Sequence, residues 1–317
     1  MKRTLFVKNA FGNVILLLLL VSRLAAQNNE SVTFIHVSDI HLIFNIELYQ
    51  RDLASSRNHY ANGVEPFELF LDKKPAETDA SFVVATGDMI DFYQGESGKR
   101  KMLNVQVEQF AQKINKSEVP VYCVLGNHDI AAYSWDGNTR NSTQNVAGIA
   151  RSAWIRNASC FYEGTYYSKM MKVGRTNYRL IFLDDSYNDN RENENMIIPY
   201  MSIEQLHWLK DQFDERDDDV EIVMMHIPLD SEKIGSIEEE NIYSVLKRQS
   251  SLKLLLVGHN HENEIKEIAG LGGKFYQVMT GAFARDPENW RVIELTENTI
   301  SVSLPGKTGQ EIKIPIK

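Results

Sequence analysis

Six short apolar runs, each closed by a glycine or a polar cluster, constrain most strongly how this chain of 317 residues can fold. Runs of nearly continuous apolar character are typical of strands that are buried on both faces. Helical patterns lie between several of the runs, and alternation of strand and helix predicts a layered α/β domain. The expected strands are residues 32–38, 81–86, 119–125, 178–183, 220–225 and 252–257.

Two of the intervening segments carry clear helical signals. Residues 103–117 place apolar side chains three or four positions apart, which gives a single apolar stripe. Residues 202–213 open with Ser202, followed three places later by Gln205, and this pattern predicts a capping box at the start of a helix.

The chain loses its helical pattern after Gly270. Four short segments of strand character follow, and we expect them to complete a second sheet. No internal repeat or proline-rich linker divides the chain, so we expect one domain over residues 27–317. The four segments are residues 274–283, 289–295, 299–304 and 311–316.

The first 26 residues have the three-part layout of a secretory signal. Three basic residues precede an apolar run over residues 14–21, and the small pair Ala25 and Ala26 follows. Cleavage after Ala26 would give a secreted or periplasmic protein. The apolar run has about half of the ~20 residues that a membrane-spanning helix needs, so a retained anchor is the weaker alternative, and no later segment is predicted to span.

The charge of the chain is acidic. The formal net charge is -9, and removal of four basic and no acidic residues with the signal makes it about -13. This balance disfavours long nucleic acid as a partner, because such binding rests on many contacts from Lys and Arg to phosphates. The two cysteines, Cys123 and Cys160, do not form a disulfide scaffold, and Cys123 is expected to be buried in an apolar run. No feature of the sequence indicates an oligomeric state.

Five polar clusters directly follow expected strands, and they hold five of the eight histidines. The carboxyl ends of strands in layered α/β proteins are where active sites collect. In extended backbone, residues i and i+2 point to the same side, so Asp39 and His41 are expected to converge, as are His259 and His261. The clusters are SDIHL (38–42), GDMID (87–91), GNHD (126–129), MMHIP (224–228) and GHNH (258–261).

These clusters combine Asp, Asn and His side chains, a donor set that suits borderline divalent metals such as Mn, Fe or Zn. The donors outnumber the four ligands of a tetrahedral zinc site. Two metals about 3.5 to 4 Å apart, bridged by a carboxylate, would use them all. The sequence therefore predicts a dinuclear metal centre.

In this order, the clusters resemble the motifs of the calcineurin-like metallophosphoesterase superfamily, over residues 32 to about 285. The resemblance implies a two-sheet β-sandwich flanked by helices in four layers. It also implies a metal-dependent phosphoesterase that hydrolyses a small phosphate mono- or diester by attack of a metal-bridging hydroxide. By the same resemblance, His128 donates a proton to the leaving group, and Asp91 orients the His128 side chain. The implied metal ligands are Asp39, His41 and His261 for the first ion, Asn127, His226 and His259 for the second, and Asp88 as the bridge.

The sequence departs from the motifs of two other classes of metallohydrolase, which disfavours both classes. Purple acid phosphatases carry Tyr and Gly where this chain has Asp91 and His41, which disfavours a tyrosinate-bound ferric ion. The HxHxDH signature of the metallo-β-lactamase fold is absent, because residues 259–264 read HNHENE and lack its Asp and its last His. A catalytically silent module with the same fold is the alternative function, although no ligand position is vacant.

Several further residues have open or structural interpretations. Residues 131–167 are rich in aromatic side chains, which could line a substrate pocket but are better explained as core. Asp184 and Asp185 end an expected strand, and solvation or turn formation is favoured over a place in the site. No catalytic role is expected for His36, His59 or His207.

Overall fold

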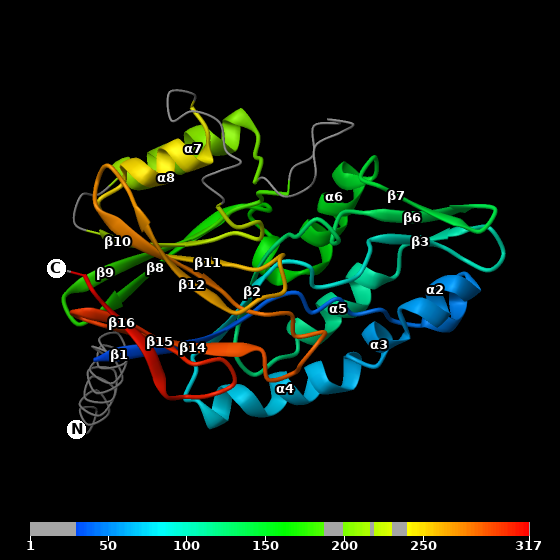
Figure 1. Ribbon diagram of the computed structural model, residues 1–317, viewed down its shortest axis with the longest axis horizontal. Coiled ribbons are helices and arrows are strands. Elements are labelled where there is room, and N and C mark those ends of the chain that lie inside the picture. The colour runs from blue at the N-terminus through cyan, green and yellow to red at the C-terminus, as the bar shows by residue number, and fades with distance from the viewer. Residues whose placement is uncertain (1–29, 187–198, 216–218, 230–239, 317) are drawn as a thin grey trace, which may run out of the picture.

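Two six-stranded sheets face each other at the centre of the computed structural model, and helices cover their outer sides (Figure 1). The structure describes residues 30–186, 199–215, 219–229 and 240–316. The expected signal segment, residues 1–26, lies outside the described residues. The predicted α/β fold with two sheets flanked by helices is confirmed.

The first sheet holds the three amino-terminal strands of the site. β1 runs parallel to β2, and β2 runs parallel to β5, so the carboxyl ends of all three lie at one edge. The other side of β1 pairs antiparallel with β14, placing Phe34 opposite Ile293. In order across the sheet, the strands are β16 (Gln310–Pro315), β15 (Thr299–Ser303), β14 (Trp290–Thr296), β1 (Ser31–Val37), β2 (Phe82–Thr86) and β5 (Val121–Val124).

The second sheet has a parallel centre and antiparallel edges. Its four middle strands are parallel, while the two outer strands run antiparallel to their neighbours. In order, the strands are β12 (Glu264–Ala269), β13 (Lys274–Met279), β11 (Leu252–Val257), β10 (Asp219–Met224), β9 (Thr176–Phe182) and β8 (Tyr167–Val173).

The carboxyl-terminal segments are strands, as predicted, but they do not all join the second sheet. Only β13 does so, whereas β14, β15 and β16 extend the first sheet beyond β1. The pattern of apolar residues identifies a strand but carries no information on which sheet it joins. The expectation of a single second sheet after Gly270 is therefore wrong for three of the four strands.

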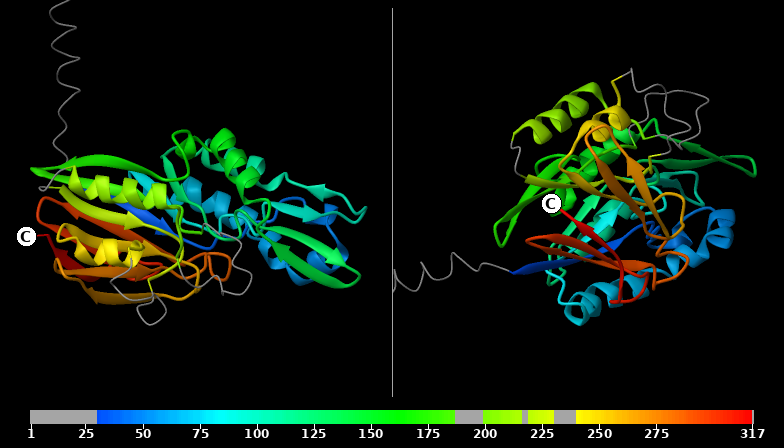
Figure 2. Two further views of the ribbon diagram at one scale, coloured as in Figure 1. Left: turned by 90° about the horizontal axis from the view of Figure 1, so that it is seen from above. Right: turned by 60° about the vertical axis from the view of Figure 1, so that its left-hand side comes forward.

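Alternate residues of the second sheet are buried on opposite faces, because the sheet is covered on both sides. Leu180 and Phe182 belong to the core that also contains Phe34 of the first sheet. Ile181 and Leu183 belong to a separate apolar cluster with residues of α7 (Ile203–Asp214) and α8 (Ile242–Arg248). Figure 2 shows these two helices lying side by side over the sheet.

The first sheet is covered on its outer side by α4 (Val64–Glu77), as Figure 1 shows. Phe67 and Phe70 of this helix are buried in the main core. The predicted helix in residues 103–117 is confirmed as α5 (Gln106–Ile114), whose Phe110 meets Trp154 of α6 (Ala147–Asn157) at 5.8 Å between ring centroids.

The start of α7 confirms one half of the predicted capping box. The Ser202 hydroxyl accepts a hydrogen bond from the backbone N–H of Gln205 at 3.3 Å. The Gln205 side chain does not return to Ser202 but bonds both backbone groups of Asp184, each at 2.9 Å. It thereby ties the helix to the end of β9.

A smaller four-stranded sheet projects beside the main sheets and was not predicted from the sequence. Its strands are β4 (Met102–Leu103), β3 (Gln94–Glu96), β6 (Ala132–Asp136) and β7 (Thr139–Thr143). The short helices α2 (Arg51–Ser56) and α3 (Asn58–Ala61) lie near it, and the single-turn helices η1 (Ile46–Leu48) and η2 (Ser159–Phe161) complete the described elements. The buried cluster between sheet and helices comprises Ile43, Tyr49, Leu53, Phe92, Tyr133 and Trp135.

Most of the aromatic side chains in residues 131–167 are core, as favoured. Tyr133, Trp135, Trp154 and Phe161 are buried, whereas Tyr162 is exposed. Cys123 is buried as expected, and both cysteines are free. No helix in the described ranges combines the length and the apolar character that a bilayer crossing requires.

Candidate metal centre

The ends of five strands, β1, β2 and β5 from the first sheet and β10 and β11 from the second, bring the polar clusters together. All nine residues expected to form the site lie in this one region. Three groups of their ligand atoms each fall within 4.8 Å: Asp39, His41 and His261; His41, Asp91 and His128; and Asp88, His226 and His259.

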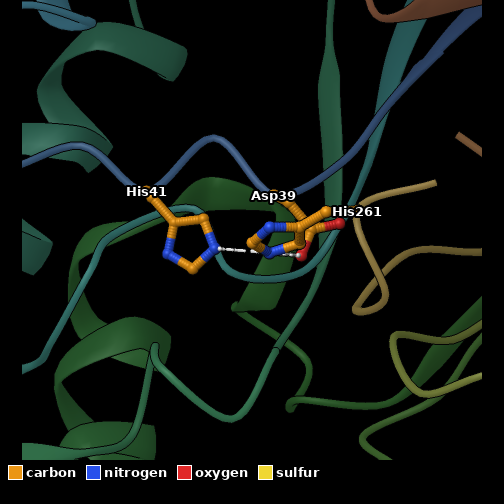
Figure 3. Close-up of side chains that lie close together, drawn as sticks. All are labelled: Asp39, His41 and His261. Atoms are coloured by element: carbon orange, nitrogen blue, oxygen red, sulfur yellow. Dashed lines mark hydrogen bonds and ion pairs between the residues drawn. The ribbon is translucent and has the colours of Figure 1, made fainter. Parts of the chain in front are cut away.

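The first group brings together residues from the first and the last of the five polar clusters, residues 38–42 and 258–261. The Nε2 atoms of His41 and His261 lie 3.2 Å apart, and Asp39 Oδ1 lies 3.2 Å from the His261 nitrogen. Figure 3 shows the three side chains pointing toward one another. Their atoms therefore surround a common point between the two sheets.

The second group lies around the amide oxygen of Asn127. This Oδ1 atom is 3.1 Å from His226 Nε2 and 3.0 Å from His259 Nδ1. The two imidazole nitrogens are 3.2 Å from each other. The amide of Asn127, from the first sheet, thus converges with the imidazoles of His226 and His259, from the second sheet.

Asp88 lies between these two groups. Its Oδ2 atom is 3.6 Å from His41 Nε2 and 3.3 Å from His226 Nε2. Its other oxygen, Oδ1, accepts a hydrogen bond from the backbone N–H of His128 at 2.8 Å. One carboxylate oxygen therefore faces both groups, and the other is held by the GNHD segment.

The two i, i+2 pairs were predicted to converge through the alternation of an extended strand, but their backbone is not extended. Asp39, His41, His259 and His261 all have left-handed backbone, with φ of 52°, 49°, 72° and 61°, and Asp88 shares it with a φ of 50°. Non-glycine residues enter this region at an energetic cost, and such residues gather at functional sites. The pairs do converge, but through tight turns beyond the strands.

Gly126 shows how closely the backbone segments of the site approach each other. A Cβ atom at this position would collide with the backbone nitrogen and the carboxylate of Asp88. The glycine of the GNHD cluster is therefore required for the β5 turn to pass beside the Asp88 carboxylate.

The charges of the site favour a bound cation. Asp39 and Asp88 are buried, and no Lys or Arg forms an ion pair with either within the described ranges. Burial opposes the charge of Asp88, but the facing imidazoles, His226 first, outweigh burial and hold its pKa well below the usual range.

The pKa of His226 also reflects the negative charge of the neighbouring carboxylates. Burial would lower it, but Asp88 above all raises it to about 10. Buried carboxylates need a compensating positive charge. Carboxylate, amide and imidazole donors around two points fit divalent metal ions of the borderline class.

His128 lies at the rim of the centre, with its side chain 23% exposed. Its Nδ1 faces the backbone oxygen of Asp91 at 2.8 Å and the Tyr133 hydroxyl at 3.1 Å. Burial would lower the pKa of His128, but the charges of Asp88 and Asp91 raise it to about 9. These two carboxylates therefore favour the charged form of the imidazole.

Asp91 contacts His128 through both its backbone oxygen and its carboxylate, and the backbone contact is the shorter one. The carboxylate oxygen Oδ1 is 3.5 Å from His128 Nδ1 and 3.4 Å from His41 Nδ1. The same oxygen accepts a 2.5 Å hydrogen bond from Arg57, which lies between α2 and α3. Arg57 was not singled out from the sequence.

Asp185 is a further residue whose role was missed. Its two carboxylate oxygens accept hydrogen bonds from the backbone N–H groups of His226 at 2.9 Å and Ile227 at 2.7 Å. Burial raises the pKa of Asp185 to about 7. Asp185 therefore fixes the turn that carries His226. The sequence favoured solvation or turn formation for Asp185 and did not predict this contact.

Asp184 and Asp129 are also buried and structural. Asp184 forms a two-point ion pair with Arg151, with distances of 2.6 and 2.9 Å. Asp129 accepts hydrogen bonds from the backbone of Gly126 at 2.7 Å and Ile90 at 3.0 Å, and burial raises its pKa to about 8. Asp129 therefore joins the GNHD turn to the GDMID segment.

The remaining histidines take no part in the three groups. His36 is buried between the hydroxyls of Thr86 and Thr280, each at 2.8 Å. His59 and His207 are exposed.

Comparison with known proteins agrees with this geometry. The family model for calcineurin-like phosphoesterases matches residues 32–263. The chain therefore belongs to the calcineurin-like phosphoesterase family. No curated protein sequence matches it.

Solved structures share the fold at low sequence identity. A dimetal phosphatase from Danio rerio superposes with a TM-score of 0.62 and 15% identity, over 90% of this chain and 99% of that one. A NAD nucleotidase from Haemophilus influenzae superposes with a TM-score of 0.50 and 12% identity, over 87% of this chain and 49% of that one. This chain thus spans about half the length of the nucleotidase.

Proposed function

We propose that the chain is a phosphoesterase that uses two divalent metal ions to hydrolyse a small phosphate mono- or diester. The observation that carries this proposal is the position of Asp88 Oδ2, within 3.6 Å of His41 and 3.3 Å of His226. A carboxylate shared by two donor groups is the arrangement that a dinuclear centre needs.

The proposed ligands divide between two ions. Asp39, His41 and His261 would hold the first, Asn127, His226 and His259 the second, and Asp88 both. Bound ions of the Mn, Fe or Zn class supply Lewis acidity toward phosphoryl oxygens and lower the pKa of water. Every proposed ligand position carries a donor side chain, which favours a catalyst over the silent binding module.

His128 is the proposed proton donor to the leaving group. With Nδ1 facing the Asp91 carbonyl oxygen, that nitrogen carries a proton, and Nε2 remains to donate its own. The carboxylates of Asp88 and Asp91 raise the pKa of His128 against the effect of burial, which favours the charged form that a proton donor needs. Asp91, in this proposal, orients the ring through its backbone oxygen.

The substrate class is proposed from the site and the family. The Danio rerio protein is a dimetal phosphatase and the Haemophilus influenzae protein a NAD nucleotidase, so phosphate esters and nucleotides are the compounds to test first. Purified protein loaded with Mn or Fe is screened against phosphomonoesters, cyclic nucleotides and phospholipid head groups. Turnover of none of them, with both ions bound, would contradict the proposed activity.

His128→Ala tests the mechanism. Because general acid catalysis contributes about a hundred- to ten-thousandfold, turnover of an alkyl ester should fall by this order, and turnover of an ester with a good leaving group should fall less. Metal content, measured by elemental analysis, should stay unchanged. His207→Ala, an exposed histidine on α7, is the control. Full turnover of the alkyl ester by His128→Ala would remove His128 from the mechanism.

We also propose that the protein acts outside the cytoplasm, as a secreted or periplasmic enzyme. The support is the basic, apolar and small-residue layout of residues 1–26. Sequencing the amino terminus of the mature protein should find a start near residue 27, and an intact start at Met1 would contradict cleavage.

A further inference from the structure

A cavity of about 560 Å³ opens beside the candidate metal centre, between α2, α3 and β7. Its size is in the range of small-molecule binding sites. The elements that form it belong to the small sheet and short helices on the right of Figure 1. Its walls are made by Asp52, Ser55, Arg57, His59, Tyr60 and Arg140, among others.

Two residues of the cavity wall also contact the metal centre. The ring of Tyr60 stacks on His41, with ring centroids 5.0 Å apart and planes 14° from parallel. The Arg57 guanidinium bonds Asp91 and lies 5.5 Å from the centre of the Tyr133 ring. The cavity and the centre therefore share a wall.

The shared wall is on the side of His128. The Tyr133 hydroxyl lies 3.1 Å from His128 Nδ1, and Asp91 contacts the same nitrogen. A phosphate monoester held at the metal centre by its phosphoryl group has only its leaving group outside the centre, next to the wall that Tyr60 and Arg57 share with the cavity. The cavity is thus placed to receive the leaving group rather than the phosphoryl group.

Arg140 gives the cavity an available positive charge. Its guanidinium carbon lies 4.8 Å from the centre of the Tyr133 ring. In the part of the chain that the structure describes, this guanidinium has no acidic partner, whereas Arg57 is engaged by Asp91. The acidic side chain in the wall, Asp52, accepts a hydrogen bond from the Trp135 indole.

We infer that this cavity selects phosphate esters whose leaving group is a ring that bears its own carboxylate or phosphate. Arg140 binds that second anion, because a planar guanidinium matches the two oxygens of such a group. The half-buried Tyr60 ring lies against the ring of the leaving group. This inference rests on the proposed function, since it assigns the substrate class of the same site.

Two aryl phosphates of the same shape test the inference: 3-carboxyphenyl phosphate and its neutral analogue, 3-carbamoylphenyl phosphate. Arg140→Gln should lower kcat/KM for the carboxylate substrate about tenfold, mainly through KM, because one charge-assisted contact is lost. The carbamoyl substrate should change less than about twofold. Equal effects on the two substrates, or no effect on either, would overturn the inference.

Arg156→Gln is the matched control, because Arg156 is an exposed arginine on α6 that does not line the cavity. It should leave kcat/KM unchanged for both substrates. A tenfold loss in this variant as well would show a general effect of charge and would also overturn the assignment to Arg140.

A binding measurement separates failure of the inference from failure of the proposed function. Binding of 3-hydroxybenzoate, the leaving group alone, is followed by ligand-observed NMR with the zinc-loaded protein. Weaker binding to Arg140→Gln than to the wild type supports the cavity assignment even if neither ester is hydrolysed. Equal binding to both proteins, or no binding to the wild type, overturns it.

Discussion

The two large sheets contribute different chemistry to the same centre. The first sheet supplies both carboxylates, Asp39 and Asp88, together with the Asn127 amide, whereas the second sheet supplies only imidazoles among the proposed ligands. The second sheet has a buried carboxylate of its own at β9, but Asp185 is turned to the backbone of His226. Negative charge is therefore concentrated on one side, and neutral donors are fixed on the other.

Because of this division, we expect substitutions of ligands from the two sheets to have different effects on metal binding. Loss of a carboxylate from the first sheet changes the charge that compensates a metal ion. Loss of an imidazole from the second sheet removes one neutral donor and leaves the charge of the site intact. Four variants test this difference between the sheets, and they are given in order of decreasing expected effect.

Asp88→Asn should have the largest effect. It removes the charge shared by both groups, so both ions should be lost and kcat/KM should fall about a hundred- to thousandfold, the order expected when one partner of a buried charge pair is removed. Elemental analysis and turnover are measured on the same sample. Retention of two ions per chain would contradict the bridging role.

His259→Ala should remove one ion rather than two. The group of Asp39, His41 and His261 keeps its donors, so we expect about one ion per chain and a loss of affinity for the second ion of about a hundredfold. His261→Ala is the mirror variant, because it comes from the same turn but serves the first group. The assignment of ions to groups fails if both variants lose the same ion.

Asp185→Asn should have a smaller effect, because Asp185 acts on the second-sheet ligands only by positioning His226. An amide in place of the carboxylate presents an N–H₂ group to one of the two backbone donors at residues 226 and 227. We expect the affinity of the second ion to fall about tenfold, as for other residues that position a ligand. Metal titration by calorimetry checks this result, and a fall in the affinity of the first ion alone would contradict it.

His36→Gln addresses the single buried imidazole within the first sheet and should have the smallest effect at neutral pH. Burial, aided by Arg291, lowers the pKa of His36 to about 3, from an ordinary value of 6.5. The unfolded chain therefore takes up a proton first, and stability should fall as pH drops from about 6.5 toward 3, by up to about 1.4 kcal/mol per pH unit.

Urea unfolding at pH 7, 6 and 5 measures this slope. The slope rather than the stability itself is compared, because the Gln substitution also alters the hydrogen bonds of residue 36 to Thr86 and Thr280. A wild type and a variant with equal slopes would show that His36 does not contribute to the acid sensitivity.

Local patterns predicted much of the fold and of the site. The strand at residues 252–257 has the predicted bounds, and the nine site residues lie together because they follow strands whose carboxyl ends meet. Patterns of this kind depend on neighbours in the sequence, so a single sequence reveals them.

The missed features depend on contacts between distant segments. Asp185 reaches the backbone of His226, Arg57 reaches Asp91, and no spacing rule connects either pair. The left-handed backbone at Asp39 and His41 is similarly set by the crowding of turns from other strands. Sheet membership of β14 to β16 was also missed, because pairing partners are chosen by tertiary packing.

The pairing of β1 with β14 has a consequence for how the protein is synthesised. β1 is hydrogen-bonded on one side to a strand near the end of the chain, so the sheet that carries Asp39 and His41 is unfinished until that strand has left the ribosome. A chain shortened by its last three strands would retain every proposed ligand and still leave β1 with an open edge, prone to pair with other chains.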